Sequence, residues 1–285
     1  MTNQQDTDVP AIDDWSRLLT GKVAVITGGG VGIGGAVARL FARHGAHVEL
    51  AEIDAERAAV AVADIEAAGG SARAHVVDVT REEDVTRLAA AVLGDHPAVH
   101  VLVNNVGDFR PLVRFRRSSP ASWRTMYDIN LFHVFAVTHA FLESMIANGG
   151  GSIVNLHSVE GMRGYPGEPV YGAMKAAVAH FTTCLAVEMG RHGVRVNGIG
   201  PDLTQTPQVD YLTGGEASEH LWPSWAPVGR VGWPEDQARV ALFLASDMSA
   251  FVTGHNIPVD GGTRAGGGWF YSPGAHRFVN RPTTL

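Results

Sequence analysis

A tyrosine and a lysine, Tyr171 and Lys175, stand four residues apart where a helix is expected to begin. Residues at this spacing share one face of a helix. A phenol has an ordinary pKa of about 10 and is a poor base at neutral pH, but a nearby ammonium group favours the phenolate and lowers that pKa. Ser158 lies thirteen residues earlier, directly after an apolar run. The three side chains together predict a proton-transfer site, although the Tyr–Lys pair alone is common on helix surfaces.

A glycine-rich segment separates the first apolar run from the first helical pattern. Glycines there permit a tight turn, let the backbone approach a pyrophosphate, and allow the first N–H groups of the helix to face it. This strand–turn–helix setting favours a phosphate-binding loop over a merely flexible one. Two overlapping dinucleotide-binding patterns fit, Gly30-x-Gly32-x-x-Gly35 and Gly28-x-x-x-Gly32-x-Gly34. The contacts expected from this segment are Gly28, Gly30, Gly32, Ile33 and Gly34.

An acidic residue about twenty positions further on is expected to bind the adenosine ribose hydroxyls. Glu52 stands twenty residues after Gly32, just beyond the second apolar run. Its carboxylate would accept two hydroxyl groups and repel a 2′-phosphate, and no Arg or Lys stands in the glycine loop or directly after Glu52. The sequence therefore favours NAD over NADP. Glu49, inside the strand, is the rival residue, and a solvated loop charge is the plain alternative for Glu52, while Asp54 is expected to cap the next helix.

Short apolar runs and amphipathic helical patterns alternate along the chain, which predicts βαβ units and a parallel sheet covered on both faces. The expected strands cover residues 22–27, 48–51, 74–77, 99–103, 152–156, 194–199 and 256–259. The expected helices cover residues 33–44, 55–68, 81–93, 121–147, 169–192 and 234–245. We expect one α/β domain, a single doubly wound (Rossmann) sheet, over residues 21–263, with a substrate loop at 202–228, a leader at 1–20 and a tail at 264–285.

The composition limits the possible function classes. Of 285 residues, 22 are Lys or Arg and 29 are Asp or Glu, and the net charge of −7 argues against a nucleic-acid partner. Cys184 is the only cysteine, which excludes an intramolecular disulfide and a Cys-pair metal site. The polar N-terminal segment is unlike a signal peptide and no apolar run has the length of a membrane span, so we expect a cytoplasmic protein with no membrane partner.

Thirteen histidines raise the question of a metal site. No pair has the HExxH spacing of a zinc site. His133 and His139 lie in one expected helix, but six residues apart and off a common face. We therefore expect no metal ion.

From Leu19 to Thr263 the chain resembles the short-chain dehydrogenase/reductase family in its compact form. The glycine loop, the serine, the tyrosine and the lysine occur in the family's order and spacing. Further matches are the adenine-contacting pair Asp78-Val79, the sheet-bracing segment Asn104-Asn105-Val106-Gly107, the helix asparagine Asn130, the nicotinamide loop within Asn197 to Thr206, and the strand end Asp260-Gly261-Gly262. The departures are Val106 for alanine, His157 for a serine, and Asp202 for the glycine after Pro201; we favour a buried spacer over a pocket group for His157.

The resemblance implies hydride transfer between nicotinamide C4 and a carbinol carbon. Ser158 would bind the substrate oxygen, Tyr171 would exchange its proton, and Asn130 would hold a water in the proton path. Lys175 would hold the nicotinamide ribose and lower the pKa of Tyr171. The cofactor contacts implied beyond the glycine loop and Glu52 are Asp78, Val79, Asn105, Val106, Gly107, Tyr171, Lys175, Pro201, Thr204 and Thr206. Compact members usually form homotetramers through the helices that match 121–147 and 169–192, with a dimer as second choice.

We therefore expect an NAD-dependent oxidoreductase that interconverts an apolar secondary alcohol and its ketone. Aromatic side chains in the 202–228 loop, such as Tyr211, Trp222 and Trp225, favour a cyclic, steroid- or terpenoid-like substrate. Packing of that loop on its own domain is the plain alternative. The tail carries Trp269 and Phe270 after three glycines, and we expect it to dock on a neighbouring subunit, with docking on its own subunit as the plain alternative.

Two other functions stay open. A 3-oxoacyl-thioester reductase, acting on an acyl carrier protein (ACP) or coenzyme A (CoA) thioester, would use a cluster of arginines to bind carrier phosphates, although a solvated basic face explains the same cluster. The cluster consists of Arg110, Arg114, Arg116 and Arg117. The other is a catalytically idle NAD-binding sensor, which has no need of an intact Ser158, Tyr171 and Lys175.

Overall fold

The computed structural model of the chain describes residues 12, 14–212, 221–267, 270–272 and 276–279. Seven parallel strands form one sheet in the order β3-β2-β1-β4-β5-β6-β7, which is the doubly wound arrangement predicted from the sequence. The chain reverses its direction of winding between β1 and β4, which are neighbours in the sheet. The strands are β1 (Val23–Thr27), β2 (His47–Glu52), β3 (Ser71–Val76), β4 (Val101–Asn104), β5 (Gly151–Leu156), β6 (Val194–Pro201) and β7 (Asn256–Val259).

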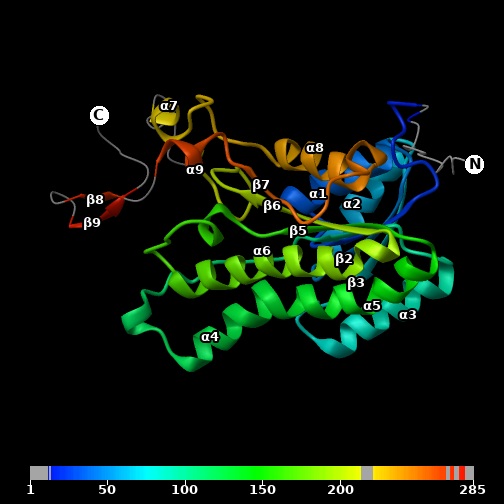
Figure 1. Ribbon diagram of the computed structural model, residues 1–285, viewed down its shortest axis with the longest axis horizontal. Coiled ribbons are helices and arrows are strands. Elements are labelled where there is room, and N and C mark those ends of the chain that lie inside the picture. The colour runs from blue at the N-terminus through cyan, green and yellow to red at the C-terminus, as the bar shows by residue number, and fades with distance from the viewer. Residues whose placement is uncertain (1–11, 13, 213–220, 268–269, 273–275, 280–285) are drawn as a thin grey trace, which may run out of the picture.

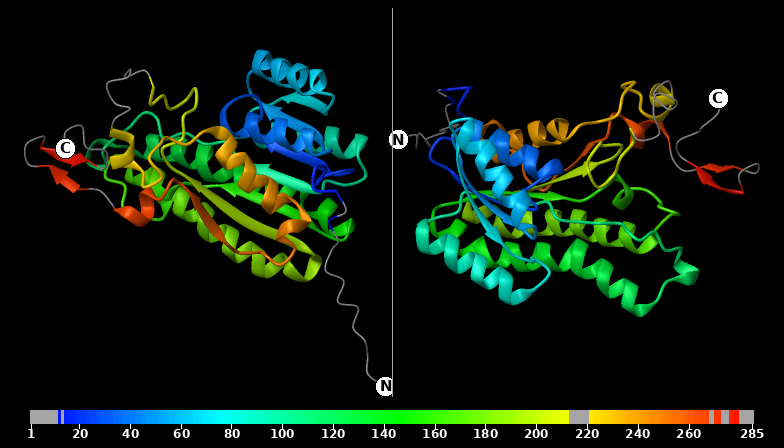
Figure 2. Two further views of the ribbon diagram at one scale, coloured as in Figure 1. Left: turned by 90° about the horizontal axis from the view of Figure 1, so that it is seen from above. Right: turned by 180° about the vertical axis from the view of Figure 1, so that it is seen from behind.

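Helices cover both faces of the sheet, as Figure 1 shows with α8, α1 and α2 above it and α3, α5 and α6 below. The view from behind in Figure 2 gives the same two layers. The helices are α1 (Gly32–Arg43), α2 (Ala55–Ala67), α3 (Glu82–Asp95), α4 (Pro120–Tyr127), α5 (His133–Ala147), α6 (Pro169–Met189), α7 (Trp222–Trp225), α8 (Pro234–Ala245) and α9 (Thr263–Gly266).

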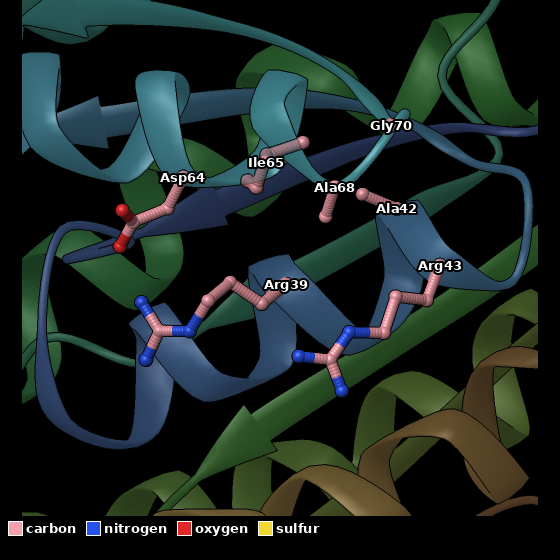
Figure 3. A pocket seen from close by; sticks show the side chains of 7 residues that line it. All are labelled: Arg39, Ala42, Arg43, Asp64, Ile65, Ala68 and Gly70. Carbon is pink, nitrogen blue, oxygen red and sulfur yellow. The ribbon is translucent and has the colours of Figure 1, made fainter.

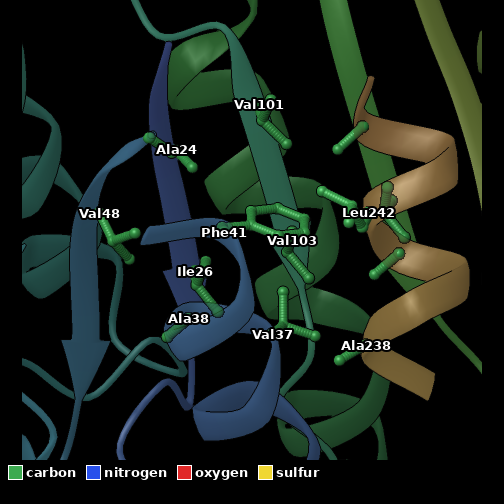
Figure 4. Close-up of a cluster of buried hydrophobic side chains, with 14 of the residues drawn as sticks. Ala24, Ile26, Val37, Ala38, Phe41, Val48, Val101, Val103, Ala238 and Leu242 are labelled. Carbon is green, nitrogen blue, oxygen red and sulfur yellow. The ribbon is translucent and has the colours of Figure 1, made fainter. Parts of the chain in front are cut away.

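Each face of the sheet buries its own apolar cluster. On one face, Phe41 of α1 lies among β1, β4 and α8, with Val37 and Leu242 close by (Figure 4). On the other face, residues of α3, α5 and α6 pack on β4 and β5, and Phe141 and Met145 are fully buried there. Because both faces are covered, the strands read as continuous apolar runs in the sequence.

Two elements differ from the sequence prediction. Strand β3 begins at Ser71 rather than at residue 74, because it is an edge strand whose first residues alternate between exposed and half-buried instead of forming an apolar run. The helix predicted over 121–147 is α4 and α5 joined by a π-helical turn, Asp128–Phe132, which holds Asn130. Turns of this kind occur often at functional sites.

Two helical stretches, Pro120–Ala147 and Pro169–His192, are long and apolar enough to cross a membrane by length and composition alone. Neither is an unbroken apolar run, so the sequence had not indicated a span. Both pack against the sheet, and the core helices of soluble proteins pass the same test.

The C-terminal segment forms an antiparallel hairpin of β8 (Phe270–Ser272) and β9 (Arg277–Val279). In both figures this hairpin stands apart from the seven-stranded sheet. Trp269 lies outside the described residues.

Candidate active site

The glycine loop joins the end of β1 to the start of α1 at the carboxyl edge of the sheet. Gly28 and Gly32 have left-handed φ angles of 64° and 58°, which favour glycine. A Cβ on Gly34 would overlap the carbonyl oxygen of Gly28, so the helix approaches the turn too closely for any side chain. The loop therefore presents bare backbone N–H groups at a helix start, which fits the pyrophosphate of a dinucleotide.

Asn105 braces this loop from the neighbouring strand. Its backbone N–H donates to Thr27 Oγ1 at 2.9 Å, and its side-chain amide donates to the carbonyl oxygens of Thr27 and Gly28 at 3.0 and 3.2 Å. The Val106 side chain would lie 3.1 Å from a Cβ on Gly28. Asn105 and Val106 therefore border the loop, as the family resemblance implies.

Glu52 lies at the tip of β2 and faces the glycine loop. Its carboxylate accepts hydrogen bonds from the N–H of Gly30 at 3.0 Å, of Ile53 at 3.0 Å and of Asp54 at 3.2 Å. A Cβ on Gly30 would lie 2.7 Å from Glu52 Oε2 and 3.0 Å from the Cβ of Arg57. An arginine thus stands beside this corner, a neighbour that the sequence analysis overlooked. Its guanidinium lies 3.7 Å from the Asp54 carboxylate.

The predicted helix cap at Asp54 is present, because Asp54 Oδ1 accepts from the N–H groups of Glu56 and Arg57 at 3.0 Å each. The other predicted adenine-side contacts follow β3. The N–H of Val77 bonds the Glu52 carbonyl at 2.9 Å, which sets Asp78 and the buried Val79 beside the end of β2. Asp78 Oδ1 accepts from Thr80, so part of its carboxylate holds the local turn.

Ser158, Tyr171 and Lys175 meet at the carboxyl ends of β4 and β5. Ser158 is buried and its Oγ accepts from the N–H of Glu160 at 3.1 Å. The Lys175 amine donates to the carbonyl of Leu156 at 3.1 Å and lies 5.8 Å from the centre of the Tyr171 ring. The structure therefore brings together the three residues that the sequence singled out.

The pKa of Tyr171 differs from the one that the sequence led us to expect. Burial raises the pKa of Tyr171 well above that of a free phenol, although hydrogen bonding with Ser158 acts in the opposite direction. Burial lowers the pKa of Lys175 to about 8. The sequence had led us to expect that Lys175 would lower the tyrosine pKa. Here the loss of solvent around the phenol is the larger effect.

Asn130 and Gly107 complete the group around Lys175. In the π-helical turn, Asn130 Oδ1 accepts from the N–H of Asp108 at 3.1 Å, and its Nδ2 donates to the Asp108 carbonyl at 2.7 Å. A Cβ on Gly107 would lie 2.6 Å from Lys175 Nζ and 3.0 Å from Asn130 Oδ1. Both side chains therefore converge on Gly107, where only a glycine leaves them room.

The segment after β6 crosses over the glycine loop. Thr206 would lie 3.8 Å from a Cβ on Gly32, and the Gln208 side chain donates to the Gly107 carbonyl at 3.2 Å. Pro201 ends β6, opposite Val259 of β7. The Thr204 hydroxyl is buried and bonds the Asp202 carbonyl and Gln237, so in this structure it anchors the segment.

Asp202 departs from the family pattern, and its charge is balanced by a residue that the sequence analysis did not single out. Arg163 Nη2 donates to Asp202 Oδ2 at 2.8 Å and also bonds Glu160. The Thr263 hydroxyl donates to the same Asp202 oxygen at 2.8 Å. The carboxylate thus fastens the segment after β6 instead of leaving a bare charge near the cofactor.

His157 is a buried spacer, as favoured from the sequence. Its ring would lie 2.9 and 2.7 Å from Cβ atoms on Gly198 and Gly200, so it fills the space that these two glycines of β6 leave open. Burial lowers the pKa of His157 to about 4, which keeps the ring neutral.

The aromatic side chains of the 202–228 loop do not support the substrate argument made from the sequence. Trp222, Trp225 and Tyr211 pack against Leu203 and Ala226 of the loop itself and against Val231, which follows it. Residues 213–220 lie outside the described part of the chain. Two other aromatic rings stand beside the catalytic phenol, which the sequence analysis had not singled out. The ring centres of Phe109 and Tyr165 each lie 6.0 Å from that of Tyr171, edge to face.

Two charged regions lie outside this group. Arg110 pairs with Asp108 at 2.8 Å, while Arg114, Arg116 and Arg117 are exposed. Figure 3 shows a surface pocket between the C-terminal halves of α1 and α2, and Arg39 in its lining reaches back toward the glycine loop, where its Nη1 would lie 3.4 Å from a Cβ on Gly35. Its lining is Arg39, Ala42, Arg43, Asp64, Ile65, Ala68 and Gly70, none of which belongs to the site above.

Comparison with known proteins agrees with this geometry. A family model described as enoyl-(acyl carrier protein) reductase matches residues 28–264. The 3-oxoacyl-[acyl-carrier-protein] reductase FabG of Chlamydia muridarum is 37% identical over 248 residues, which are 87% of this chain and 99% of the relative. A cyclohexanol dehydrogenase of Acinetobacter sp. is 35% identical over 246 residues, 86% and 96% of the two chains.

Solved structures agree in fold. A short-chain type dehydrogenase/reductase from Mycobacterium ulcerans superposes with a TM-score of 0.82 at 32% identity, over 87% of this chain and 91% of the other. A 7α-hydroxysteroid dehydrogenase complexed with NADH and 7-oxo glycochenodeoxycholic acid superposes with a TM-score of 0.81 at 33% identity, over 88% and 98%. The motif order, the sheet, the grouped side chains and these similarities agree, and the chain belongs to the short-chain dehydrogenase/reductase family of oxidoreductases, whose members bind a nicotinamide cofactor.

Proposed function

We propose that this protein interconverts an apolar secondary alcohol and its ketone with NAD as cofactor. The observation that carries the proposal is the meeting of Ser158, Tyr171 and Lys175 beside the glycine loop. A chain that only binds a nucleotide has no need of a phenol, an amine and a hydroxyl at one point. The idle sensor is therefore the weaker alternative.

Each side chain has a distinct task in this reaction. The Ser158 hydroxyl hydrogen-bonds the substrate oxygen, and the Tyr171 hydroxyl takes the proton of that oxygen in oxidation or gives one in reduction. The Lys175 ammonium stands close enough to favour the phenolate as it forms. When bound, the nicotinamide ring accepts or donates the hydride. Asn130, fixed by the Asp108 backbone, holds a water on the proton path.

Glu52 supports NAD as the cofactor. Its buried carboxylate, fixed by the Gly30 N–H, stands where the adenosine ribose is expected and would repel a 2′-phosphate. Two arginines stand near this corner. Arg57 pairs with Asp54, which leaves its guanidinium less available to a phosphate, and Arg39 Nη1 would lie 3.4 Å from a Cβ on Gly35. Of the solved structures named above, the 7α-hydroxysteroid dehydrogenase is complexed with NADH.

The aromatic rings beside Tyr171 support an apolar substrate. These rings belong to other residues than those that the sequence indicated. Phe109 and Tyr165 stand edge to face against the catalytic ring. A cyclohexanol dehydrogenase is similar to this chain in sequence, and a steroid dehydrogenase is similar to it in fold. A cyclic secondary alcohol is therefore the first substrate class to test.

A 3-oxoacyl-thioester reductase is the second candidate. The FabG relatives favour it, and so does the surface before α4, where Arg114, Arg116 and Arg117 stand exposed beside the exposed apolar side chains Leu112 and Phe115. A basic and apolar rim suits a phosphorylated carrier that delivers an acyl chain. Such reductases usually take NADPH, and the Glu52 carboxylate would repel its 2′-phosphate, which argues against this function.

We also propose a homotetramer, with a dimer as second choice. The helices α5 and α6 are apolar along most of their length, and Val187 on α6 is 80% exposed. Pairing such faces between subunits would remove them from water. The C-terminal hairpin, which stands apart from the sheet, would then reach a neighbouring subunit.

One assay separates the two functions. The purified protein is given NAD or NADP with cyclic secondary alcohols, and in reverse NADH or NADPH with cyclic ketones and 3-oxoacyl thioesters, with Tyr171→Phe as control. Turnover of cyclic alcohols with NAD that is lost in Tyr171→Phe supports the proposal. Turnover confined to 3-oxoacyl thioesters with NADPH would replace it with the second candidate.

A further inference from the structure

A buried glutamate outside the active site is surrounded by histidines. Glu49 of β2 has a side chain with no solvent exposure. His47 Nε2 lies 3.1 Å and His96 Nε2 2.7 Å from the same carboxylate oxygen, Oε1. His75 Nε2 lies 2.6 Å from the other oxygen, Oε2. Three imidazole rings therefore meet at one carboxylate, and all four side chains are of metal-ligating type.

The cluster is assembled by strand register, not by sequence spacing. His47 and Glu49 lie two apart on β2 and so face the same side of the sheet. His75 comes from the neighbouring strand β3, opposite Ala51, and His96 is the residue directly after α3. This site is distinct from the cofactor loop, because Glu52 lies three residues further along β2 and its side chain faces the glycine loop instead.

The charge of Glu49 is not balanced by a lysine or an arginine. Among the described residues, its ion-pair partners are these three histidines alone. Arg73 lies directly opposite Glu49 in the strand register, but its guanidinium pairs with Asp95 at the end of α3. A buried carboxylate favours a cation beside it.

We propose that His47, Glu49 and His96 bind a Zn²⁺ ion through the two Nε2 atoms and Oε1. These three ligand atoms all lie within 4.8 Å of one another. Zinc–nitrogen and zinc–oxygen bonds of about 2.0–2.1 Å place tetrahedral ligands roughly 3.3 Å apart. The two N–O distances of 3.1 and 2.7 Å therefore need to open by less than about 1 Å. Two histidines and a glutamate are a ligand set that zinc uses, with water in the fourth position.

Solvent access and outer partners suit this assignment. The His47 and His96 side chains are 28% and 21% exposed, so a water can complete the coordination from the edge of the sheet. His75 holds the second carboxylate oxygen, and Ser71 Oγ lies 2.6 Å from His47 Nδ1. Partners of this kind fix the orientation of metal ligands and the tautomer of a ligating histidine.

The ion would fasten the end of α3 to β2. Both β2 and β3 continue into the adenine side of the cofactor site, through Glu52 and Asp78. Zinc would therefore stabilise the edge of the sheet that carries this half of the site, without taking part in the reaction. From sequence spacing we expected no metal ion. The proposal departs from that expectation because strand register, which spacing does not reveal, assembles the cluster.

The test uses the full chain with Cys184→Ser, because Cys184 Sγ lies 3.6 Å from His180 Nε2 on exposed α6 and offers zinc a second pair of ligands. The protein is stripped with a chelator, given zinc chloride, passed over a desalting column, and its zinc is counted by mass spectrometry. We expect one ion per chain, and a melting temperature about 5 °C higher at a hundredfold excess of zinc over its Kd. Cobalt(II) in place of zinc should give the visible bands of a four- or five-coordinate ion.

Matched variants assign the ligands. Glu49→Gln and His96→Gln should each weaken zinc binding by more than the roughly 10–100-fold that loss of an outer partner costs, and His75→Gln should fall within that range. His192→Gln, an exposed histidine outside the cluster, should bind like the parent. Zinc that is not retained by the parent, or is retained equally by Glu49→Gln and His96→Gln, overturns the proposal. If circular dichroism shows that a ligand variant is unfolded, zinc retention by the parent protein and its cobalt spectrum decide whether the proposal holds. None of these readouts depends on the catalytic activity.

Discussion

Arg163 bonds Asp202 at 2.8 Å across 39 residues of sequence, and both side chains are almost fully buried. The arginine follows the short helical turn Val159–Gly161 after Ser158, whereas the aspartate begins the segment that crosses the glycine loop. Arg163 also bonds Glu160, so one guanidinium balances two carboxylates. This contact joins the catalytic serine loop to the segment that covers the cofactor site.

Arg163→Met should therefore affect both stability and cofactor binding. Removing one partner of a buried ion pair leaves an uncompensated charge and costs about 3–5 kcal/mol. Because the segment after β6 loses its anchor, we also expect a higher KM for the cofactor with a smaller change in kcat. Urea unfolding and steady-state kinetics measure the two effects. Arg239→Met is the control, since Arg239 is 71% exposed in its pair with Asp236 and should shift stability by less than about 0.5 kcal/mol. Equal, small effects of both variants would show that the buried pair anchors nothing.

The raised pKa of Tyr171 predicts the pH dependence of the reaction. Burial keeps the phenol protonated at neutral pH, and oxidation needs it to accept a proton. We expect kcat/KM for alcohol oxidation to rise with pH in the neutral range and to rise less steeply above about pH 8, where Lys175 loses the charge that favours the phenolate. Ketone reduction, which uses the protonated phenol, should stay level over the neutral range. Tyr165→Phe, a change beside the catalytic ring, should keep the rise, and Tyr171→Phe should lose turnover. A flat oxidation profile would remove Tyr171 as the proton acceptor.

His133 predicts sensitivity to acid. It is fully buried in α5 below the site, and burial together with the charge of Lys175 lowers its pKa to about 3. Between about pH 3 and its ordinary value of 6.5, the unfolded chain binds a proton at this position that the folded chain does not. Stability should therefore fall as the pH drops through this window, by roughly 1.4 kcal/mol per pH unit from this group.

Urea unfolding at several pH values checks this prediction. His133→Leu removes the titrating ring at similar volume. It should reduce the slope of the unfolding free energy against pH by the equivalent of about one bound proton, and the exposed His192→Leu should leave that slope unchanged. His157, whose pKa burial lowers to about 4, adds to the slope in both proteins. A slope that His133→Leu does not alter would mean that other groups cause the acid sensitivity.

The sequence predicted the sheet and the catalytic group because both leave local signals. Strands buried on both faces read as apolar runs, and Ser158, Tyr171 and Lys175 each follow a strand or begin a helix at the same edge of the sheet. The start of β3 was missed because an edge strand alternates polar and apolar residues. The π-helical turn at Asn130 was missed because its residues also fit a regular helix.

Long-range contacts explain the rest. The Arg163–Asp202 pair and the cluster around Glu49 join residues from different elements, and only strand register and loop packing bring them together. The tyrosine pKa was misjudged for a related reason. Sequence spacing identifies a neighbouring charge at four residues, but not how completely the fold removes water from the phenol.

Glu52 should decide between the two cofactors. Its carboxylate is fixed by the Gly30 N–H, at the corner where the proposed function puts the adenosine ribose. Glu52→Gln keeps the size and removes the charge, so the ratio of kcat/KM for NADP to that for NAD should rise about 10- to 100-fold, as expected for a charged hydrogen bond of about 1.5–3 kcal/mol. Glu66→Gln, which removes one charge from the exposed face of α2, should leave the ratio unchanged. Replacing Arg57 by alanine in the Glu52→Gln chain should then reverse part of the gain, because Arg57 would be the cation beside the phosphate. An unmodified protein that already prefers NADP would assign that role to Arg57 from the start and would overturn the NAD proposal.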